Sequence, residues 1–124
     1  MHKPQIDAVV LHVADMQRST EFYAMLGIEL DYEKHGDGPV HYTTKLGGVH
    51  FGLYEAQAEG QASIRPTAGA SMLGFQVADI DALATALLDA GVEVHTPIQN
   101  RSWGRRMIVL DPDGRCVELN QAHS

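Results

Sequence analysis

The stretch His12–Leu30, HVADMQRSTEFYAMLGIEL, is matched 64 residues later by QVADIDALATALLDAGVEV at Gln76–Val94. Both stretches carry a Val-Ala-Asp triplet near the start and end on a Gly, a Glu and two flanking apolar residues. These stretches contain two matching blocks, HVADM with QVADI and GIEL with GVEV. A third pair of blocks, Gly47–Tyr54 and Asp113–Asn120, aligns at an offset of 66. Three blocks in the same order at a nearly constant offset predict two copies of one unit of about sixty residues.

Each copy contains the same order of predicted elements. An alternating strand comes first, an Asp caps the following helix, a Gly ends that helix, and three shorter strands follow. The predicted strands lie at 7–13, 29–33, 41–46, 49–54, 73–77, 93–97, 106–110 and 116–120, and the helices at 16–26 and 80–90. The expected fold class is therefore α+β, with tandem βαβββ modules at 1–56 and 71–124 joined by a linker at 57–70.

Composition narrows the class of protein. The chain has 124 residues, which suits one domain or two fused half-size units, and 44% of them are apolar, enough for a core. The net charge of −7 and the lack of a basic stripe argue against nucleic-acid binding. No apolar run reaches the length of a membrane span, and the N-terminus lacks a signal-peptide pattern. With Cys116 as the one cysteine, we expect a reduced, cytoplasmic protein without a membrane or nucleic-acid partner.

Alternation divides four of the predicted strands into two faces. One face is apolar and is expected to lie beneath the helices, whose own apolar stripes are Phe22, Met25 and Leu26, and Ile80, Leu83, Leu87 and Leu88. The other face carries Ala8, Val10, His12, His50, Gly52, Tyr54, Met72, Gly74, Gln76, Cys116, Glu118 and Asn120. Its small, polar and aromatic residues favour a surface that lines a ligand, with a solvated sheet face as the alternative.

The segments LHVADMQRSTEFYAMLGIEL, GFQVADIDALATALLDAGVEV and WGRRMIVLDPDGRCVELNQ make the chain similar to the vicinal oxygen chelate superfamily. This group includes glyoxalase I, extradiol dioxygenases, and fosfomycin-resistance and bleomycin-resistance proteins. The resemblance covers nearly the whole chain. It implies paired modules whose curved mixed sheets surround a cleft, within one chain or across two, and it implies a homodimer.

The resemblance also implies four positions that hold a divalent ion in metal-dependent relatives. They fall on Ala8, Gly52, Met72 and Glu118 in this sequence. Ala and Gly have no side-chain donor and Met is a soft thioether, so three of the four positions are lost and no metal or other cofactor is expected. A rebuilt site of His50, Glu118 and one more histidine is the alternative. His12 lies too far along its strand, and His35, His41 and His95 are expected in turns or outer strands.

Without the ion, the chain is similar to the bleomycin-resistance branch, whose members bind a drug in the cleft. The expected ligand-binding residues are His12, His50, Tyr54, Met72, Gln76, Trp103, Arg106 and Glu118. Trp103 offers a stacking surface or, alternatively, anchors its loop. Arg105 and Arg106 are expected to pair a ligand carboxylate or Glu118, or to be solvated. The acidic chain favours cationic ligands.

Three functions follow for this sequence. The first is a dimer that binds a small molecule without metal and sequesters a drug. The second is a glyoxalase-type lyase or isomerase, with Glu118 as a general base of raised pKa in an apolar cleft or with a rebuilt metal site. The third is a non-catalytic dimer with a vestigial cleft. The sequence does not identify the ligand.

Overall fold

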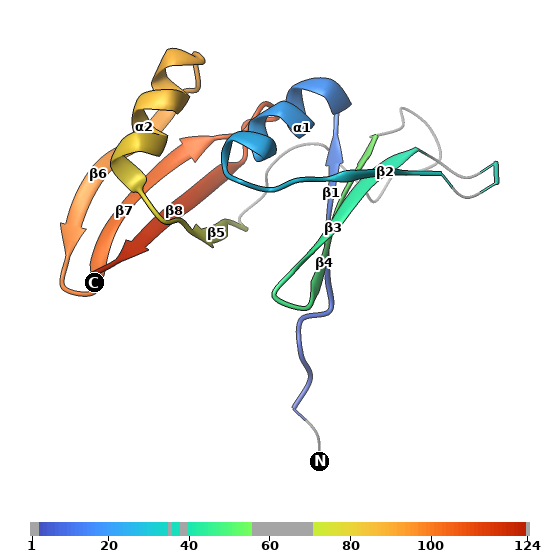
Figure 1. Cartoon of the computed structure of the whole chain (residues 1–124), viewed down its shortest axis with the longest axis horizontal. Helices are drawn as coiled ribbons and strands as arrows, with labels where there is room; N and C mark the ends of the chain where they lie inside the picture. Colours follow the sequence, from blue (N-terminus) through green and yellow to red (C-terminus); the bar gives the residue numbers. More distant parts are fainter. Residues whose placement is uncertain (1–2, 35, 38–39, 56–70, 124) are drawn as a thin grey trace. The chain divides into compact units, whose positions relative to one another are not determined.

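The computed structural model describes residues 3–34, 36–37, 40–55 and 71–123 (Figure 1). The chain divides into two compact units, Met1–Pro66 and Thr67–Ser124. The linker predicted at 57–70 lies outside the described residues. None of the helices in the described ranges is long and apolar enough to span a membrane.

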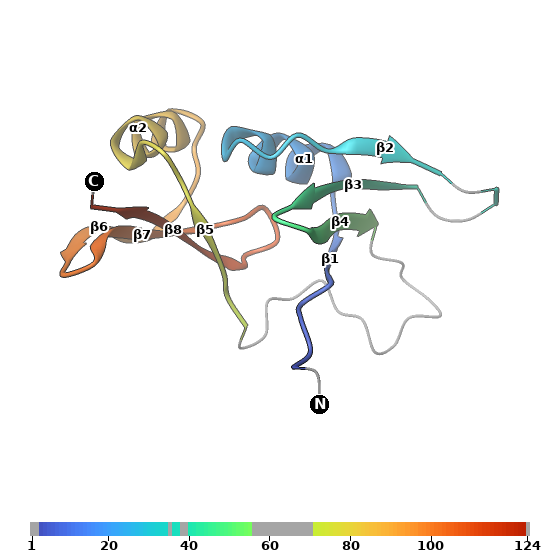
Figure 2. The ribbon, with the colours of Figure 1, turned by 60° about the horizontal axis from the view of Figure 1, so that its bottom comes forward.

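The first unit contains one helix and one four-stranded sheet. Its elements are β1 (Ala8–Val13), α1 (Met16–Met25), β2 (Asp31–Glu33), β3 (His41–Leu46) and β4 (Val49–Glu55). The strands lie in the order β1-β4-β3-β2, with β1 parallel to β4 and the other pairs antiparallel. Helix α1 lies over one face of this sheet (Figure 2). No helix in the described residues of this unit lies on the opposite face, which we call the helix-free face.

The second unit repeats this arrangement. Its elements are β5 (Leu73–Gln76), α2 (Ile80–Asp89), β6 (Val94–Arg101), β7 (Gly104–Leu110) and β8 (Cys116–Ala122). The strands lie in the order β5-β8-β7-β6, again with one parallel pair, β5 and β8. Helix α2 covers one face of the sheet (Figure 2). The predicted α+β fold of two tandem βαβββ modules is confirmed.

The strand register shows the repeat residue by residue. In the first unit Val10 lies opposite Gly52, and in the second Gly74 lies opposite Glu118. The members of these pairs are related by the offsets of 64 and 66 that the sequence shows. Equivalent sequence positions therefore occupy equivalent places in the two sheets.

Both helices begin at the predicted residues, Met16 and Ile80, and end one residue before the predicted ends, at Met25 and Asp89. The side chain of Asp15 accepts a hydrogen bond from the backbone N–H of Arg18 at 3.0 Å, and Asp79 accepts one from that of Ala82 at 3.1 Å. Just beyond the helix ends, Gly27 and Gly91 have φ angles of 95° and 80°. This left-handed conformation favours glycine, which explains why both helices stop there.

Each unit has its own apolar core, most of it on the helix side of its sheet, whereas Ile108, opposite Glu118, is buried on the other face. The buried apolar residues are Val13, Phe22, Tyr23, Ile28, Phe51 and Leu53 in the first unit, and Ile80, Leu87, Met107, Ile108, Val109, Val117 and Leu119 in the second. The prediction that Leu88 belongs to this core is wrong, because its side chain is 60% exposed. Consecutive helical residues are about 100° apart, which turns Leu88 away from the face that Leu87 buries.

Several strand boundaries differ from the predicted ones. The strand expected at 29–33 contains only Asp31–Glu33. The strand expected at 93–97 continues to Arg101, and its partner begins at Gly104. Pro97 falls within a register irregularity between Thr96 and Gln99, where its missing N–H leaves no gap in the ladder. The sequence predicts that the strand ends at this proline, whereas the irregularity allows the strand to continue beyond it.

Candidate functional site

Polar residues cross the helix-free face of the first sheet in one row. His12, Tyr54, His41 and Glu33 lie side by side on β1, β4, β3 and β2. The rings of His12 and Tyr54 are 6.0 Å apart, and those of Tyr54 and His41 are stacked at 4.5 Å with an angle of 6°. We call these four residues the aromatic row. It gives the first unit a polar, ring-lined surface that crosses all four strands.

His41 anchors the aromatic row. It is only 6% exposed, and its Nε2 lies 3.1 Å from Oε2 of Glu33. The prediction that His41 lies in a turn or an outer strand is wrong, because β3 is an inner strand of the sheet. The sequence does not reveal this, because it does not show that the short strand Asp31–Glu33 pairs with β3 and forms the edge of the sheet.

The equivalent row of the second sheet is made of amides and a guanidinium. Gln76, Asn120, Arg106 and Gln99 lie side by side on β5, β8, β7 and β6. Arg106 therefore occupies the position of His41, and Asn120 that of Tyr54. The second unit thus has the same row with different chemistry.

Glu118 lies next to this row and is held by two of its members. Nη2 of Arg106 is 2.9 Å from Oε2 of Glu118, and Nδ2 of Asn120 donates to Oε1 at 2.9 Å. Gly74 lies opposite Glu118, and a Cβ at position 74 would make an ordinary contact with Oε1 at 3.4 Å. We call Arg106, Glu118 and Asn120 the Glu118 cluster. The surrounding of Glu118 is apolar only in part, since it lies opposite the buried Ile108 while a cation and an amide contact its carboxylate.

The other predicted ligand-binding residues are spread over both units. His50 shares the helix-free face of the first sheet with His12. The two are not neighbours, because His12 lies opposite Tyr54, which is four residues beyond His50 on β4. Met72 precedes β5 and is 47% exposed, and Trp103 lies in the turn before β7 and is 49% exposed. His12 and Tyr54 are brought together in one row, as are Gln76 and Arg106, with Glu118 beside the latter. Trp103 is too exposed for a buried loop anchor.

The residues at the family's four metal positions do not fit a divalent ion. Ala8 and Gly52 have no side-chain donor, and they are not opposite each other in the sheet. The carboxylate of Glu118 is already paired with Arg106. Within the described ranges, no three His, Cys, Asp or Glu residues gather in a geometry for a metal ion. A catalytic ion takes about three protein ligands, so the donor set is too small.

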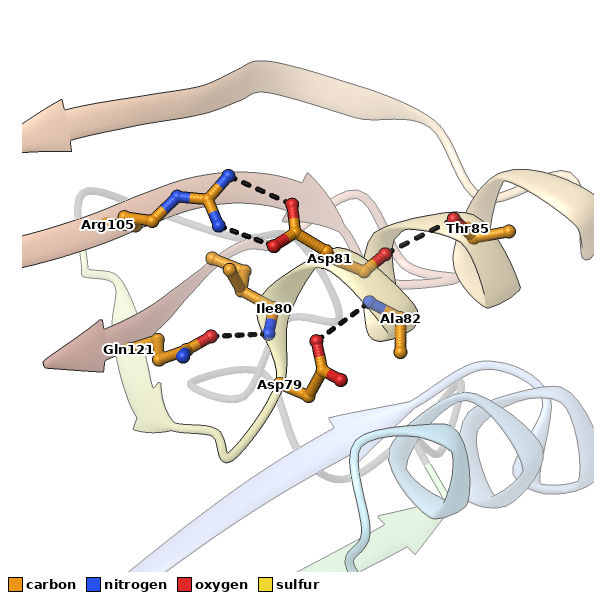
Figure 3. Close-up of polar contacts among 7 residues, drawn as sticks. All are labelled: Asp79, Ile80, Asp81, Ala82, Thr85, Arg105 and Gln121. Atoms are coloured by element: carbon orange, nitrogen blue, oxygen red, sulfur yellow. Dashed lines mark hydrogen bonds and ion pairs between the residues drawn. The ribbon is translucent and has the colours of Figure 1, made fainter. Parts of the chain in front are cut away.

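Arg105 lies on the opposite face of β7 from Arg106 and fixes the start of α2 (Figure 3). Its two terminal nitrogens lie 2.5 and 2.9 Å from the carboxylate oxygens of Asp81. The hydrogen bonds from Arg105 lower the pKa of Asp81 below its ordinary value of 3.8, and Asp81 in turn raises the pKa of Arg105. Oε1 of Gln121 also accepts a hydrogen bond from the backbone N–H of Ile80 at 2.7 Å. Arg105 is thus a structural residue of the helix side.

Sequence reasoning missed several residues of the two rows. Alternation places Asn120 on the correct face but gives it no role, and no sequence pattern assigns Glu33, His41 or Gln99 to a site. The repeat carries a signal for these residues, because His41 and Tyr54 of the first copy correspond to Arg106 and Asn120 of the second. Pairing of β2 with β3 and of β6 with β7 could not be read from the sequence.

Comparisons with known proteins agree with this fold. The model of the Glyoxalase/Bleomycin resistance protein/Dioxygenase superfamily matches residues 5–119. Among curated proteins, no significant match to the chain is found. Three solved structures cover 94–99% of the chain, and their likeness is in the fold.

The first of these is a glyoxylase/bleomycin resistance protein/dioxygenase domain from Frankia sp. EAN1pec, with 25% identity, a TM-score of 0.68 and coverage of 98% of this chain and 100% of that one. An antibiotic binding protein from Streptomyces sp. CB03234 has 24% identity, a TM-score of 0.66 and coverage of 99% of both chains. A glyoxalase-related enzyme from Fulvimarina pelagi has 20% identity, a TM-score of 0.69 and coverage of 94% of this chain and 87% of that one. With nearly its whole length matched by the family model, the chain belongs to the Glyoxalase/Bleomycin resistance protein/Dioxygenase superfamily.

Proposed function

We propose that the protein binds a small organic molecule through the helix-free faces of its sheets, without the divalent metal of its family, and that it sequesters an antibiotic. The observation that carries this proposal is the Glu118 cluster, in which a guanidinium and an amide hold the one carboxylate at the family's metal positions. The similarity to an antibiotic binding protein from Streptomyces supports the choice of ligand class.

The aromatic row supports ligand binding in the first unit. Tyr54 and His12 are partly exposed, and they present rings and polar edges together on the helix-free face. Small-molecule sites combine aromatic surface with a few placed polar groups. The row therefore offers contact area and hydrogen-bonding groups to one ligand.

The Glu118 cluster favours binding over glyoxalase-type chemistry. A general base must accept a proton from its substrate within hydrogen-bond reach. Both carboxylate oxygens of Glu118 already have a partner, so proton transfer to either would disturb an existing contact. Ligand binding by the wild-type protein together with absent turnover of hemithioacetal supports the binding function.

The proposal includes a homodimer in a reducing compartment. Cys116 is a free cysteine, which suits a place where thiols stay reduced. Light scattering after gel filtration measures the oligomeric state. A mass of one chain at micromolar concentration contradicts the dimer.

A binding screen with metal analysis tests the proposed function. Purified protein is dialysed with and without EDTA, its metal content is measured by mass spectrometry, and antibiotics that include bleomycin are screened by thermal shift. We expect less than stoichiometric metal and at least one antibiotic whose thermal shift is equal in both samples. Stoichiometric Ni, Zn, Fe or Mn that survives dialysis, or a binding signal that EDTA abolishes, contradicts the proposal.

A matched pair of tyrosine variants locates the ligand. Tyr54→Leu removes a ring from the aromatic row, whereas Tyr32→Leu removes a 58% exposed ring on the other face of the same sheet. We expect calorimetric titration to show weaker binding of the best antibiotic to Tyr54→Leu only. Equal affinity in both variants would move the site away from the aromatic row.

A further inference from the structure

The Glu118 cluster has an internal balance of charge. Arg106 and Glu118 form an ion pair, and their side chains are only 21% and 23% exposed. A guanidinium is protonated at every accessible pH, so its charge does not depend on a bound ion. The cluster therefore holds one fixed positive and one negative charge side by side in a largely buried place.

We propose that Arg106 takes the place of the family's divalent ion at Glu118 and binds the carbonyl or hydroxyl oxygen of a neutral ligand. This inference rests on the proposed function and specifies its ligand chemistry. In relatives that keep the ion, the carboxylate is balanced by a metal. In this chain the balancing cation belongs to the protein, and its N–H groups replace coordination with hydrogen bonds.

The unused donors of Arg106 support an oxygen ligand. A guanidinium has five N–H donors, and the ion pair with Glu118 is made by Nη2. Within the described ranges, the buried Nε of Arg106 has no hydrogen-bond partner, and neither has the buried Oδ1 of Asn120. A buried donor without an acceptor costs free energy, which a ligand oxygen beside the guanidinium would recover.

The charge balance selects a neutral ligand. A carboxylate or phosphate near Arg106 would also lie near the negative Glu118, and a cation near Glu118 would lie near Arg106. At close range in a partly buried place, each of these like-charge contacts is unfavourable. A neutral amide, ketone or alcohol avoids both. The sequence leaves open whether Arg106 pairs a ligand carboxylate or Glu118; a neutral ligand differs from the first alternative and from the expected preference of the acidic chain for cations.

The orientation of Asn120 follows from the same contacts. Its Nδ2 donates to Glu118, which accepts only, so the buried Oδ1 is the acceptor that has no partner. A ligand with a carbonyl oxygen and a neighbouring N–H therefore matches both groups of this pair, the donor on Arg106 and the acceptor on Asn120. Primary carboxamides have this pattern.

Three probes that share a naphthalene ring and carry a neutral, an anionic or a cationic substituent test the inference. They are 2-naphthamide, 2-naphthoate and 2-naphthylmethylammonium, titrated into 15N-labelled full-length protein and followed by NMR. We expect 2-naphthamide to bind several-fold more tightly than the two ions and to shift the side-chain signals of Arg106 and Asn120. Preference for either ion, or no binding by any of the probes, overturns the inference.

Variants assign the preference to the charge pair. In Glu118→Gln the guanidinium loses its counter-charge, so we expect 2-naphthoate to become the best probe. Arg106→Leu should lose the preference for 2-naphthamide, and Arg106→Lys, which keeps the charge, should keep part of it. The control Arg105→Leu removes one positive charge from the helix side of the same strand and should leave the preference intact. Thermal unfolding verifies that each variant is folded.

The failures of the two proposals are distinguishable. An antibiotic that binds wild type and Arg106→Leu with equal affinity overturns the role of Arg106 and leaves metal-free binding intact. A tightly bound metal overturns the proposed function whatever the naphthalene probes show.

Discussion

His41 on β3 and Arg106 on β7 occupy the same position of the repeated unit. Each lies opposite a β4 or β8 residue that the repeat also pairs, Tyr54 for His41 and Asn120 for Arg106. His41 contacts Glu33 and stacks on Tyr54, whereas Arg106 pairs with Glu118. One backbone position thus supports an aromatic contact in one sheet and a cation in the other.

The contact between His41 and Glu33 should stabilise the first unit. His41→Phe keeps a flat ring for stacking on Tyr54 but loses the hydrogen bond to Glu33, so we expect roughly 1 kcal/mol less stability in urea unfolding. His95→Phe, on the exposed edge strand β6, is the control and should change stability by less than about 0.5 kcal/mol. Equal effects of the two variants would contradict a specific role for His41.

Neighbouring leucines on α2 should differ sharply in their effect on stability. Leu87 is fully buried and Leu88 is 60% exposed. Leu87→Ala should lower the free energy of unfolding by about 2–5 kcal/mol, because it leaves a cavity in the core. Leu88→Ala should stay within about 0.5 kcal/mol of wild type. Chemical denaturation followed by circular dichroism compares them, and similar losses in both would contradict the orientation of α2.

Two glycines of the second sheet should respond differently to alanine. Gly104 has a φ angle of 154°, and a Cβ on it would overlap the carbonyl oxygen of Gln121 and lie 2.9 Å from Cα of Ala122. A Cβ on Gly74 would make ordinary contacts at 3.4 and 3.5 Å with Glu118 and Asn120. We expect Gly104→Ala to unfold at a much lower temperature and Gly74→Ala to remain close to wild type. A Gly104→Ala protein with wild-type thermal stability would refute the close approach of β7 to β8.

Acid should weaken the attachment of α2. The pKa of Asp81 is lowered by hydrogen bonds from Arg105. A lowered pKa in the folded state means that the contact contributes fully above the ordinary value of 3.8 and is lost as the pH falls through the folded value. Melting temperatures measured between pH 2 and pH 6 should therefore fall more steeply in wild type than in Asp81→Asn. Parallel curves for the two proteins would show that Asp81 does not contribute.

The sequence predicted the elements and their order because each element has a local cause. Asp15 and Asp79 cap the helices, Gly27 and Gly91 end them, and alternation assigns the strand faces. These signals lie within a few residues of one another. The exposed Leu88 shows their limit, since an apolar residue beside the stripe is read as part of it.

The candidate site was predicted in part. Alternation placed His12, Tyr54 and Glu118 on the correct face, but contacts across strands depend on register. The ion pair of Arg106 with Glu118 joins residues on adjacent strands, and Glu118 is one of the two partners that the sequence suggests for Arg106. Glu33 and Gln99 entered the rows only through pairing at the sheet edges, where β2 is short and β6 carries an irregularity.

The tandem arrangement has a consequence for how such a protein can evolve. If the two sheets came from two identical chains of one βαβββ unit each, every substitution would appear in both sheets. Here the two copies are separate stretches of one chain, and each has its own apolar core. A gene of this kind can change the residue at position 41 without changing position 106, so the surface chemistry of each sheet is free to diverge from that of the other.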